Sequence, residues 1–265
     1  MAEVPAKRFW HLSRPSENQW QLTLSNPPEN RLLPLVLVDL SSRLDEIEAE
    51  WRTTWEAAPE DKKPGGSVVL ASDNKKFWSN GFDPTKMGRA GFMPYVFYPV
   101  MNRLLTFPLI TVASINGHCF AGGMLIALSC DYRLMTTGKG WMSMNEPIPS
   151  EVCRLLAARV SPTYWTKLLL GHRWTSQEAL AAGFVDEIVD NDGAHEGKLL
   201  KRSLAFAAER APNVASGAWG LIKAGVTTPI ADQPHKWRMT YRPPHEREMF
   251  KHGTKDFFYV GNSKL

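Results

Sequence analysis

Residues 115–123 read Ile-Asn-Gly-His-Cys-Phe-Ala-Gly-Gly, and the elements predicted around them indicate the class of fold. The apolar run 109–115 predicts a strand, Asn116-Gly117 predicts a turn, and the small residues 121–123 predict the opening of a helix. No Lys, Arg, Asp or Glu lies between Leu104 and Cys130, so these elements are expected in the core. The Pro, Asn and Gly residues in this run favour buried elements over a membrane span.

Two further stretches stand out in the sequence. Residues 76–83 read Lys-Phe-Trp-Ser-Asn-Gly-Phe-Asp, and residues 144–147 read Met-Asn-Glu-Pro. Glycine lets a turn bring its backbone N–H close to a ligand, and the first N–H groups of a helix have no partner within the helix. Two such donors from different loops can stabilise one negatively charged oxygen. The stretches therefore predict a site built partly from backbone N–H groups.

In the rest of the chain, the spacing of apolar residues and the positions of turn residues predict strand-strand-helix units followed by a helical second half. The expected strands are 20–24, 67–71, 109–115, 131–135 and 140–143, with a polar loop over 72–80. The expected helices are 34–57, 93–105, one opening at 121–123, 151–159, 164–170, 176–182, 193–210 and 214–224.

The order of these elements predicts an α/β or α+β superhelix of repeated ββα units. A doubly wound nucleotide-binding fold is not favoured, because the sequence contains no GxGxxG or GxxxxGK[ST] motif. We expect residues 1–200 to form the ββα core with the active site and residues 201–265 to form a helical C-terminal region.

Composition narrows the class of protein. With 265 residues, 43% of them hydrophobic, the chain has the composition of a folded globular protein. Its net charge of +4 is carried by residues 235–265, where seven basic residues oppose three acidic ones, and no nucleic-acid readout motif accompanies them. The three cysteines lack metal-ligand spacing, so neither a disulfide framework nor a metal site is expected.

Taken together, the three stretches resemble the crotonase (enoyl-CoA hydratase/isomerase) superfamily. Residues 77–83, Phe-x-x-Asn-Gly-Phe-Asp, stand where that family has Phe-Ser-x-Gly-x-Asp, and residues 115–123 match its Ile-Asn-Gly-x-x-x-Ala-Gly-Gly loop. The similarity continues through Cys-Asp-Tyr-Arg at 130–133 and through 174–186, and it spans about residues 19 to 225.

The resemblance implies a crotonase-like superhelix that binds an acyl-CoA thioester. Its oxyanion hole would consist of the backbone N–H groups of Phe82 and Gly122. The substrate itself carries coenzyme A, so no separate cofactor is expected. Lys75 and Lys76, where the first hole loop begins, are candidates to meet the phosphates of CoA.

The acid and base groups distinguish the possible reactions. The hydratases of the family that this chain resembles use two catalytic Glu residues. The position of the first Glu falls at Leu125 in this chain, and a leucine side chain cannot orient water. The second falls close to Glu146, and monofunctional Δ3,Δ2-enoyl-CoA isomerases resemble this chain in presenting one carboxylate after Asn. Glu146 is therefore the expected catalytic residue, with Leu125 at the substrate. The apolar residues around Glu146 would raise the pKa of its carboxyl. A dienoyl-CoA isomerase, a hydratase and a non-catalytic acyl-CoA-binding or assembly protein remain alternatives.

Location and assembly follow from other features. Ser263-Lys264-Leu265 is the tripeptide that the peroxisomal import receptor reads at a free C-terminus, so the peroxisomal matrix is expected. No secretory signal is expected at residues 1–9, which lack an apolar core. The family's members are mostly trimers or dimers of trimers, so a homotrimer or hexamer is expected.

Overall fold

The fold is described from a computed structural model over residues 7–87, 91–138, 140–145, 150–190 and 197–231. Its larger sheet has the strand order β1-β2-β3-β5-β7-β9. β1 pairs antiparallel with β2, and every later pair is parallel. The strands are β1 (Trp10–Ser16), β2 (Gln19–Leu24), β3 (Ser67–Ser72), β5 (Ile110–Ile115), β7 (Tyr132–Thr136) and β9 (Glu187–Val189).

A second sheet of three short strands stands beside the first. Its order is β4-β6-β8, and both of its pairs are parallel. The strands are β4 (Phe77–Ser79), β6 (His118–Phe120) and β8 (Met142–Ser143). β4 lies within residues 72–80, where a polar loop was expected, and that expectation was wrong. A three-residue strand is too short to show a periodic pattern, and Lys75-Lys76 precede it.

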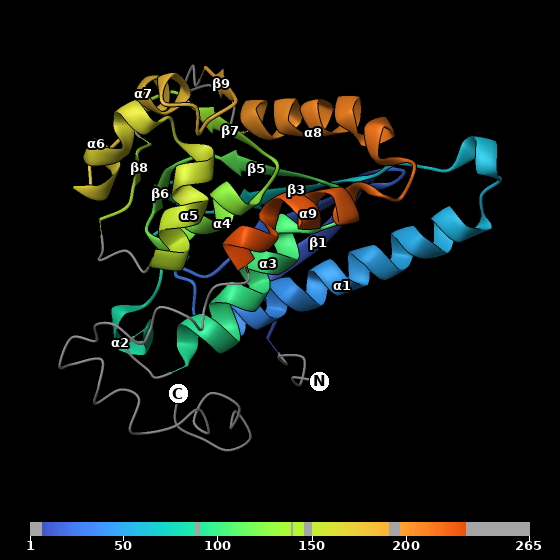
Figure 1. The fold of residues 1–265 in the computed structure, drawn as a ribbon, viewed down its shortest axis with the longest axis horizontal. Helices are drawn as coiled ribbons and strands as arrows, with labels where there is room; N and C mark the ends of the chain where they lie inside the picture. The colour runs from blue at the N-terminus through green and yellow to red at the C-terminus, as the bar shows by residue number, and fades with distance from the viewer. Residues whose placement is uncertain (1–6, 88–90, 139, 146–149, 191–196, 232–265) are drawn as a thin grey trace.

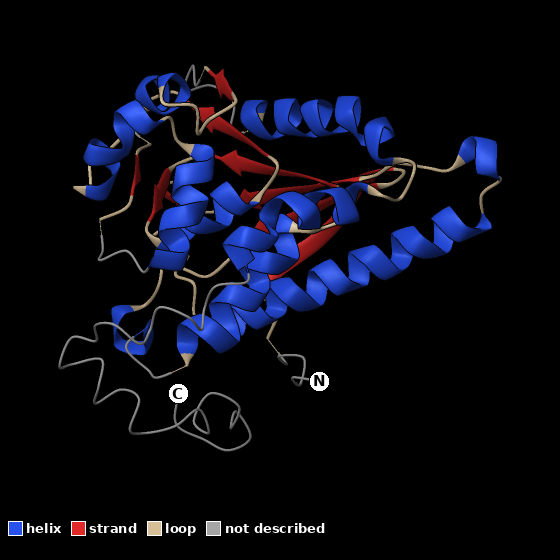
Figure 2. Cartoon of the chain, viewed as in Figure 1, coloured by secondary structure: helices blue, strands red, loops and turns tan. Residues whose placement is uncertain are grey.

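Helices cover both faces of the larger sheet, and Figure 2 shows the strands as a layer between them. The longer helices are α1 (Pro34–Ala57), α3 (Tyr98–Leu105), α4 (Gly122–Ser129), α5 (Ser150–Arg159), α8 (Lys198–Arg210) and α9 (Trp219–Ala231). The shorter ones are α2 (Pro84–Met87), α6 (Trp165–Leu169) and α7 (Ser176–Ala181), with single turns at Glu60–Lys62, Pro162–Tyr164 and Ala211–Val214 and a π-helix at Met93–Phe97.

The two faces of the sheet bury different clusters, because successive side chains of a strand point to opposite sides. Val69, Val112 and Leu134 pack with Phe206 of α8, which runs along one side of the sheet in Figure 1. Neighbouring residues such as Leu70 face the larger cluster, to which α1, α3, α4 and α5 contribute. This double coverage explains why the central strands are apolar without alternation.

The helix at the end of the described chain differs from the expected range of 214–224. A single turn over Ala211–Val214 precedes it, Gly217 adopts a left-handed conformation with φ of +74°, and α9 begins only at Trp219. A residue in this conformation ends a run of helical geometry, so the turn and the helix are separate elements.

Candidate functional site

The small sheet brings the three sequence stretches to one edge. Phe77 of β4 pairs with His118 of β6, and Phe120 of β6 pairs with Ser143 of β8, all in parallel. Parallel strands end at the same edge of a sheet. The chain therefore leaves this edge three times, toward 80–83, 121–123 and 144–145.

The first two of these loops are in close contact. Gly81 has φ of +75°, and a Cβ at this position would lie 2.8 Å from the Cβ of Ala121 and 3.2 Å from the nitrogen of Gly122. A Cβ at Gly122 would lie 2.6 Å from the ring of Phe82. Glycine is required at both positions, because any side chain would separate the two loops.

Hydrogen bonds fix the peptide unit that carries the Phe82 N–H. The carbonyl of Gly81, which belongs to that unit, accepts from the N–H of Leu32 at 2.8 Å. Carbonyl and N–H of a trans peptide point in opposite directions, so the Phe82 N–H points away from Leu32. None of the hydrogen bonds between described residues uses this N–H.

The Gly122 N–H is oriented in the same manner. The carbonyl of Ala121 accepts from the N–H of Leu125 at 3.1 Å, as expected in the first turn of α4, so the Gly122 N–H points out of the helix end. Within the described part of the chain, no hydrogen bond uses it either. Two free donors thus occur on loops in contact.

Ala121 has an unusual backbone conformation at this junction, with φ of +47°. Residues other than glycine occupy this region at a cost of roughly 1–3 kcal/mol, and they do so where the surrounding structure holds them. The Ala121 N–H donates to the carbonyl of Ser143 at 2.8 Å. The strand β8 therefore holds the strained residue that turns β6 into α4.

A buried amide supports the first loop from below. Asn30 is fully buried, and its Nδ2 donates to the Oγ of Ser72 at 2.8 Å. The backbone carbonyl of Asn30 accepts from the Oγ of Ser79 at 2.7 Å, and that Oγ in turn accepts from the N–H of Gly81 at 3.2 Å. This network, absent from the sequence-based site, fixes the loop from β4 to Phe82.

Comparison with known proteins identifies the family. The family model described as enoyl-CoA hydratase/isomerase matches residues 20–258. The chain belongs to the enoyl-CoA hydratase/isomerase family. The expected family and the α/β crotonase fold are thus confirmed.

Among similar proteins are members of this family named as isomerases. Enoyl-CoA delta isomerase 3 of Arabidopsis thaliana is 32% identical over 180 residues, which are 62% of this chain and 71% of the relative. Enoyl-CoA delta isomerase 2, peroxisomal, of the same plant is 30% identical with the same two coverages. The crystal structure of human mitochondrial delta3-delta2-enoyl-CoA isomerase shares 25% identity and has a TM-score of 0.72, with coverage of 95% and 94%.

Three of the other predicted site residues, Lys75, Lys76 and Leu125, are among those that the structure describes. Lys75 and Lys76 are exposed just before β4, and the carbonyl of Lys76 accepts from the N–H of His118 at 2.8 Å. Leu125 lies one turn into α4 with its side chain buried in the core. Glu146 and Ser263-Lys264-Leu265 lie outside the described residues.

His118 belongs to an aromatic stack that the sequence did not reveal. Its ring stacks on Phe120 at 5.1 Å and on Trp141 at 5.0 Å between centroids, and its Nδ1 accepts from the Trp141 N–H at 3.3 Å. Burial, together with the charges of Lys76 and Arg173, lowers the pKa of His118. A neutral, stacked imidazole fits a structural role for this residue.

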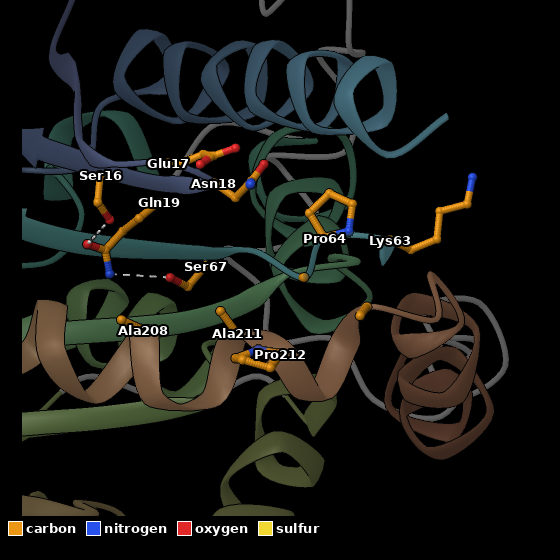
Figure 3. Close-up of a pocket in the computed structure, with 12 residues that line it drawn as sticks. Ser16, Glu17, Asn18, Gln19, Lys63, Pro64, Ser67, Ala208, Ala211 and Pro212 are labelled. Carbon is orange, nitrogen blue, oxygen red and sulfur yellow. Dashed lines mark hydrogen bonds between the residues drawn. The ribbon is translucent and has the colours of Figure 1, made fainter. Parts of the chain in front are cut away.

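A cavity of about 370 Å³ is lined by none of the residues of the three site loops, and Figure 3 shows its lining. Gln19 and Ser67, which begin β2 and β3, line it together with Pro64 and Ala211. It therefore opens at the N-terminal ends of the strands, whereas the candidate site lies at the C-terminal ends of the small sheet. We place no catalytic chemistry in this cavity.

Among the residues that the structure describes, no group of three or more His, Cys, Asp or Glu side chains could hold a metal ion. No described helix is both long and apolar enough to cross a bilayer.

Proposed function

We propose that this protein is a Δ3,Δ2-enoyl-CoA isomerase that converts a 3-enoyl-CoA into the trans-2-enoyl-CoA. The proposal rests on the contact between Phe82 and Gly122 at one edge of the small sheet, each with a backbone N–H that no hydrogen bond between described residues uses. The names of similar family members support the same reaction.

In the proposed reaction, the two N–H groups form an oxyanion hole for the thioester oxygen. When a proton leaves C2, negative charge moves onto this oxygen, and donors already aimed at it stabilise the dienolate without rearrangement. Removing one such donor typically slows a reaction by roughly 100- to 1,000-fold. Because both donors belong to the backbone, only changes of loop geometry can remove them.

Glu146 is the proposed acid and base. It would take the proton from C2 and return it to C4, so one carboxyl group serves both steps. Ser143, three residues earlier in the sequence, pairs with Phe120, two residues before Gly122. This spacing supports the proposal of a carboxylate near the hole. The neighbours of Glu146 in the sequence include the apolar Met142 and Met144, and burial among apolar groups would raise the pKa of the carboxyl.

Leu125 supports isomerisation over hydration. Adding water to a double bond calls for groups that orient and deprotonate the water, and a buried hydrocarbon side chain at this position does neither. A 1,3-proton shift needs no water and no further cofactor. The substrate brings coenzyme A, and we propose the exposed Lys75 and Lys76 as contacts for its phosphates.

A substrate comparison tests the proposal. Purified protein is incubated with 3-hexenoyl-CoA, and the conjugated product is followed by its ultraviolet absorbance; in parallel, 2-hexenoyl-CoA is tested for loss of conjugation by hydration. The proposal predicts rapid conjugation of the first and little loss of the second. Hydration faster than isomerisation would assign a hydratase, and binding of both thioesters without turnover would assign a non-catalytic acyl-CoA-binding protein.

We also propose a peroxisomal location, through recognition of Ser263-Lys264-Leu265 by the import receptor. Similar proteins bear peroxisomal as well as mitochondrial names, so location needs its own test. A fluorescent protein fused in front of the full chain should enter peroxisomes, and the same fusion lacking the tripeptide should not. A full-length fusion that stays outside peroxisomes would contradict this location.

We propose further that the protein assembles as a homotrimer or hexamer. On α9, Leu221, Ile222 and Val226 are 78%, 56% and 74% exposed, and such an apolar face is costly in water. Light scattering coupled to size-exclusion chromatography should give three or six times the mass of the chain. A monomeric mass at micromolar concentration would contradict the assembly.

A further inference from the structure

We propose that Arg31 is a positioning residue that holds the Phe82 N–H in the direction needed for the oxyanion hole. This inference rests on the proposed function and adds to it a residue that does not touch substrate. It starts from the contact between the Arg31 guanidinium and the backbone of the loop that follows β4.

Arg31 lies between Glu29 and the loop that follows β4, where its Nη1 also donates a long bond to the carbonyl of Asn80 at 3.5 Å. Its Nε donates to Oε2 of Glu29 at 2.9 Å, and its Nη1 donates to the carbonyl of Phe82 at 2.8 Å. Its side chain is 32% exposed, so water screens these bonds only partly. A bond from a charged donor is stronger than one between neutral groups.

The bond to the Phe82 carbonyl completes the control of this residue's backbone. Two peptide planes meet at the α-carbon of Phe82. The first holds the Gly81 carbonyl and the Phe82 N–H, and Leu32 fixes it; the second holds the Phe82 carbonyl, and Arg31 fixes it. Rotation about either backbone bond of Phe82 would break one of these contacts, so the N–H has one favoured direction.

Consecutive residues supply the two contacts. Leu32 donates from its main chain and Arg31 from its side chain. One short segment therefore binds the peptide groups on both sides of the Phe82 α-carbon. Glu29 binds the same loop at Asn80. Its backbone carbonyl accepts from the Asn80 N–H at 3.0 Å, and its Oε2 accepts from Nδ2 of Asn80 at 3.0 Å. The loop is thus tied to residues 29–32 at each position from 80 to 82.

A ligand role for Arg31 is the main competing explanation, since arginine also binds phosphates. Glu29 and the Phe82 carbonyl already occupy two sides of its guanidinium fork, and that occupation favours a positioning role. The two roles differ in the step that they affect. Loss of a phosphate ligand weakens CoA binding, whereas loss of a positioning contact weakens stabilisation of the enolate.

The experiment compares Arg31→Met with Arg43→Met. Arg43 is a matched control, because its Nε donates to the carbonyl of Trp10 at 3.0 Å and its Nη1 pairs with Glu46 at 2.7 Å, away from the site. Four quantities are measured: kcat and KM on 3-hexenoyl-CoA, the ultraviolet band of bound acetoacetyl-CoA in its enolate form, and the Kd of free CoA. Arg31→Lys serves as the conservative variant, since it restores a charged donor.

We expect Arg31→Met to lower kcat by about 10- to 100-fold, the scale for a misplaced catalytic group, and to weaken the enolate band. KM and the Kd of CoA should stay within about threefold, and Arg31→Lys should recover part of the kcat. Arg43→Met should match wild type in all four quantities, even if both variants lose similar thermal stability.

Several results would overturn the inference. They are an unchanged kcat and enolate band in Arg31→Met, an equal loss in Arg43→Met, or a raised Kd for CoA with kcat intact, which would make Arg31 a phosphate ligand. A wild-type protein that forms the enolate without isomerising 3-hexenoyl-CoA would refute the proposed function alone, and the enolate band would then decide the role of Arg31. A wild-type protein without the enolate band would refute the proposed oxyanion hole and therefore also the positioning role of Arg31.

Discussion

The ring of Phe82 lies directly against the α-carbon of Gly122, so close that a methyl group there would stand 2.6 Å from two ring carbons. The ring cannot easily give way, because Phe92 and Phe97 pack edge-on against it at 5.1 and 4.8 Å between centroids. This contact sets the spacing of the two loops.

Gly122→Ala should therefore disable the site while the protein remains folded. We expect kcat on 3-hexenoyl-CoA to fall by about 100-fold or more, because the displaced loop carries one of the two donors. Gly197→Ala is the control, since a Cβ at that position has open space around it, and it should keep near-normal activity. Equal activity in the two variants would show that the loop contact does not matter for the reaction.

Much of the scaffold follows from the sequence, as α1 illustrates. The spacing of Leu37, Leu40, Leu44 and Ile47 predicts a helix over 34–57, and the structure has it with those residues fully buried. β1 was missed, because only its first residue is buried and most of the rest are exposed. An edge strand with few apolar residues gives no alternating pattern.

Some residues of the candidate site could likewise be predicted from the sequence, and others could not. Phe82 and Gly122 were found through local motifs, because glycine-rich turns leave a signature in the sequence. Asn30 and Arg31 were missed, because their roles depend on contacts with residues 49 and 51 positions away. No local pattern shows which polar side chain will support a distant loop.

The buried ion pair between Asp131 and Lys223 predicts a large loss of stability when one charge is removed. Nζ lies 3.0 Å from Oδ1, and each side chain is 8% exposed. Asp131→Asn should lower the free energy of unfolding by about 3–5 kcal/mol, because it leaves Lys223 buried without its counter-charge. Denaturant unfolding provides the measurement.

A double variant and a surface variant test the cause of that loss. Adding Lys223→Met should restore much of the stability, because no buried charge then lacks a partner. Glu50→Gln, at the exposed pair with Arg14, should cost less than about 1 kcal/mol. If the double variant were less stable than Asp131→Asn, charge would not be the cause.

Cysteine reactivity should follow burial. Burial raises the pKa of Cys119 well above its usual value and, with the nearby Asp131 charge, raises that of Cys130 to about 12. Both should stay protonated and unreactive toward iodoacetamide at pH 8, whereas the half-buried Cys153 should be alkylated. Mass spectrometry should find one modified cysteine in the native protein and three after denaturation; rapid native labelling of Cys119 would disprove the prediction.

The contacts of the Glu29 carboxylate with Asn80 and Arg31 should make a contribution to stability that depends on pH. Hydrogen bonds from Asn80 and then Arg31 lower its pKa, despite an opposing effect of burial. A folded pKa below the unfolded value means that this contribution is present above about pH 4.5 and is lost as pH falls through the folded pKa. The stability difference between wild type and Glu29→Gln should thus be constant from pH 8 to 6 and shrink in acid. A difference that grew in acid would contradict the assignment.

The proposed single carboxylate is tested most directly by kcat on 3-hexenoyl-CoA in Glu146→Gln, with Glu151→Gln, five residues later in the sequence, as the matched control. If Glu146 moves the proton, its variant should lose at least about 100-fold in kcat, the scale of general acid–base catalysis, while still binding the thioester. Glu151→Gln should keep near-normal kcat. Full activity in Glu146→Gln would show that Glu146 does not move the proton.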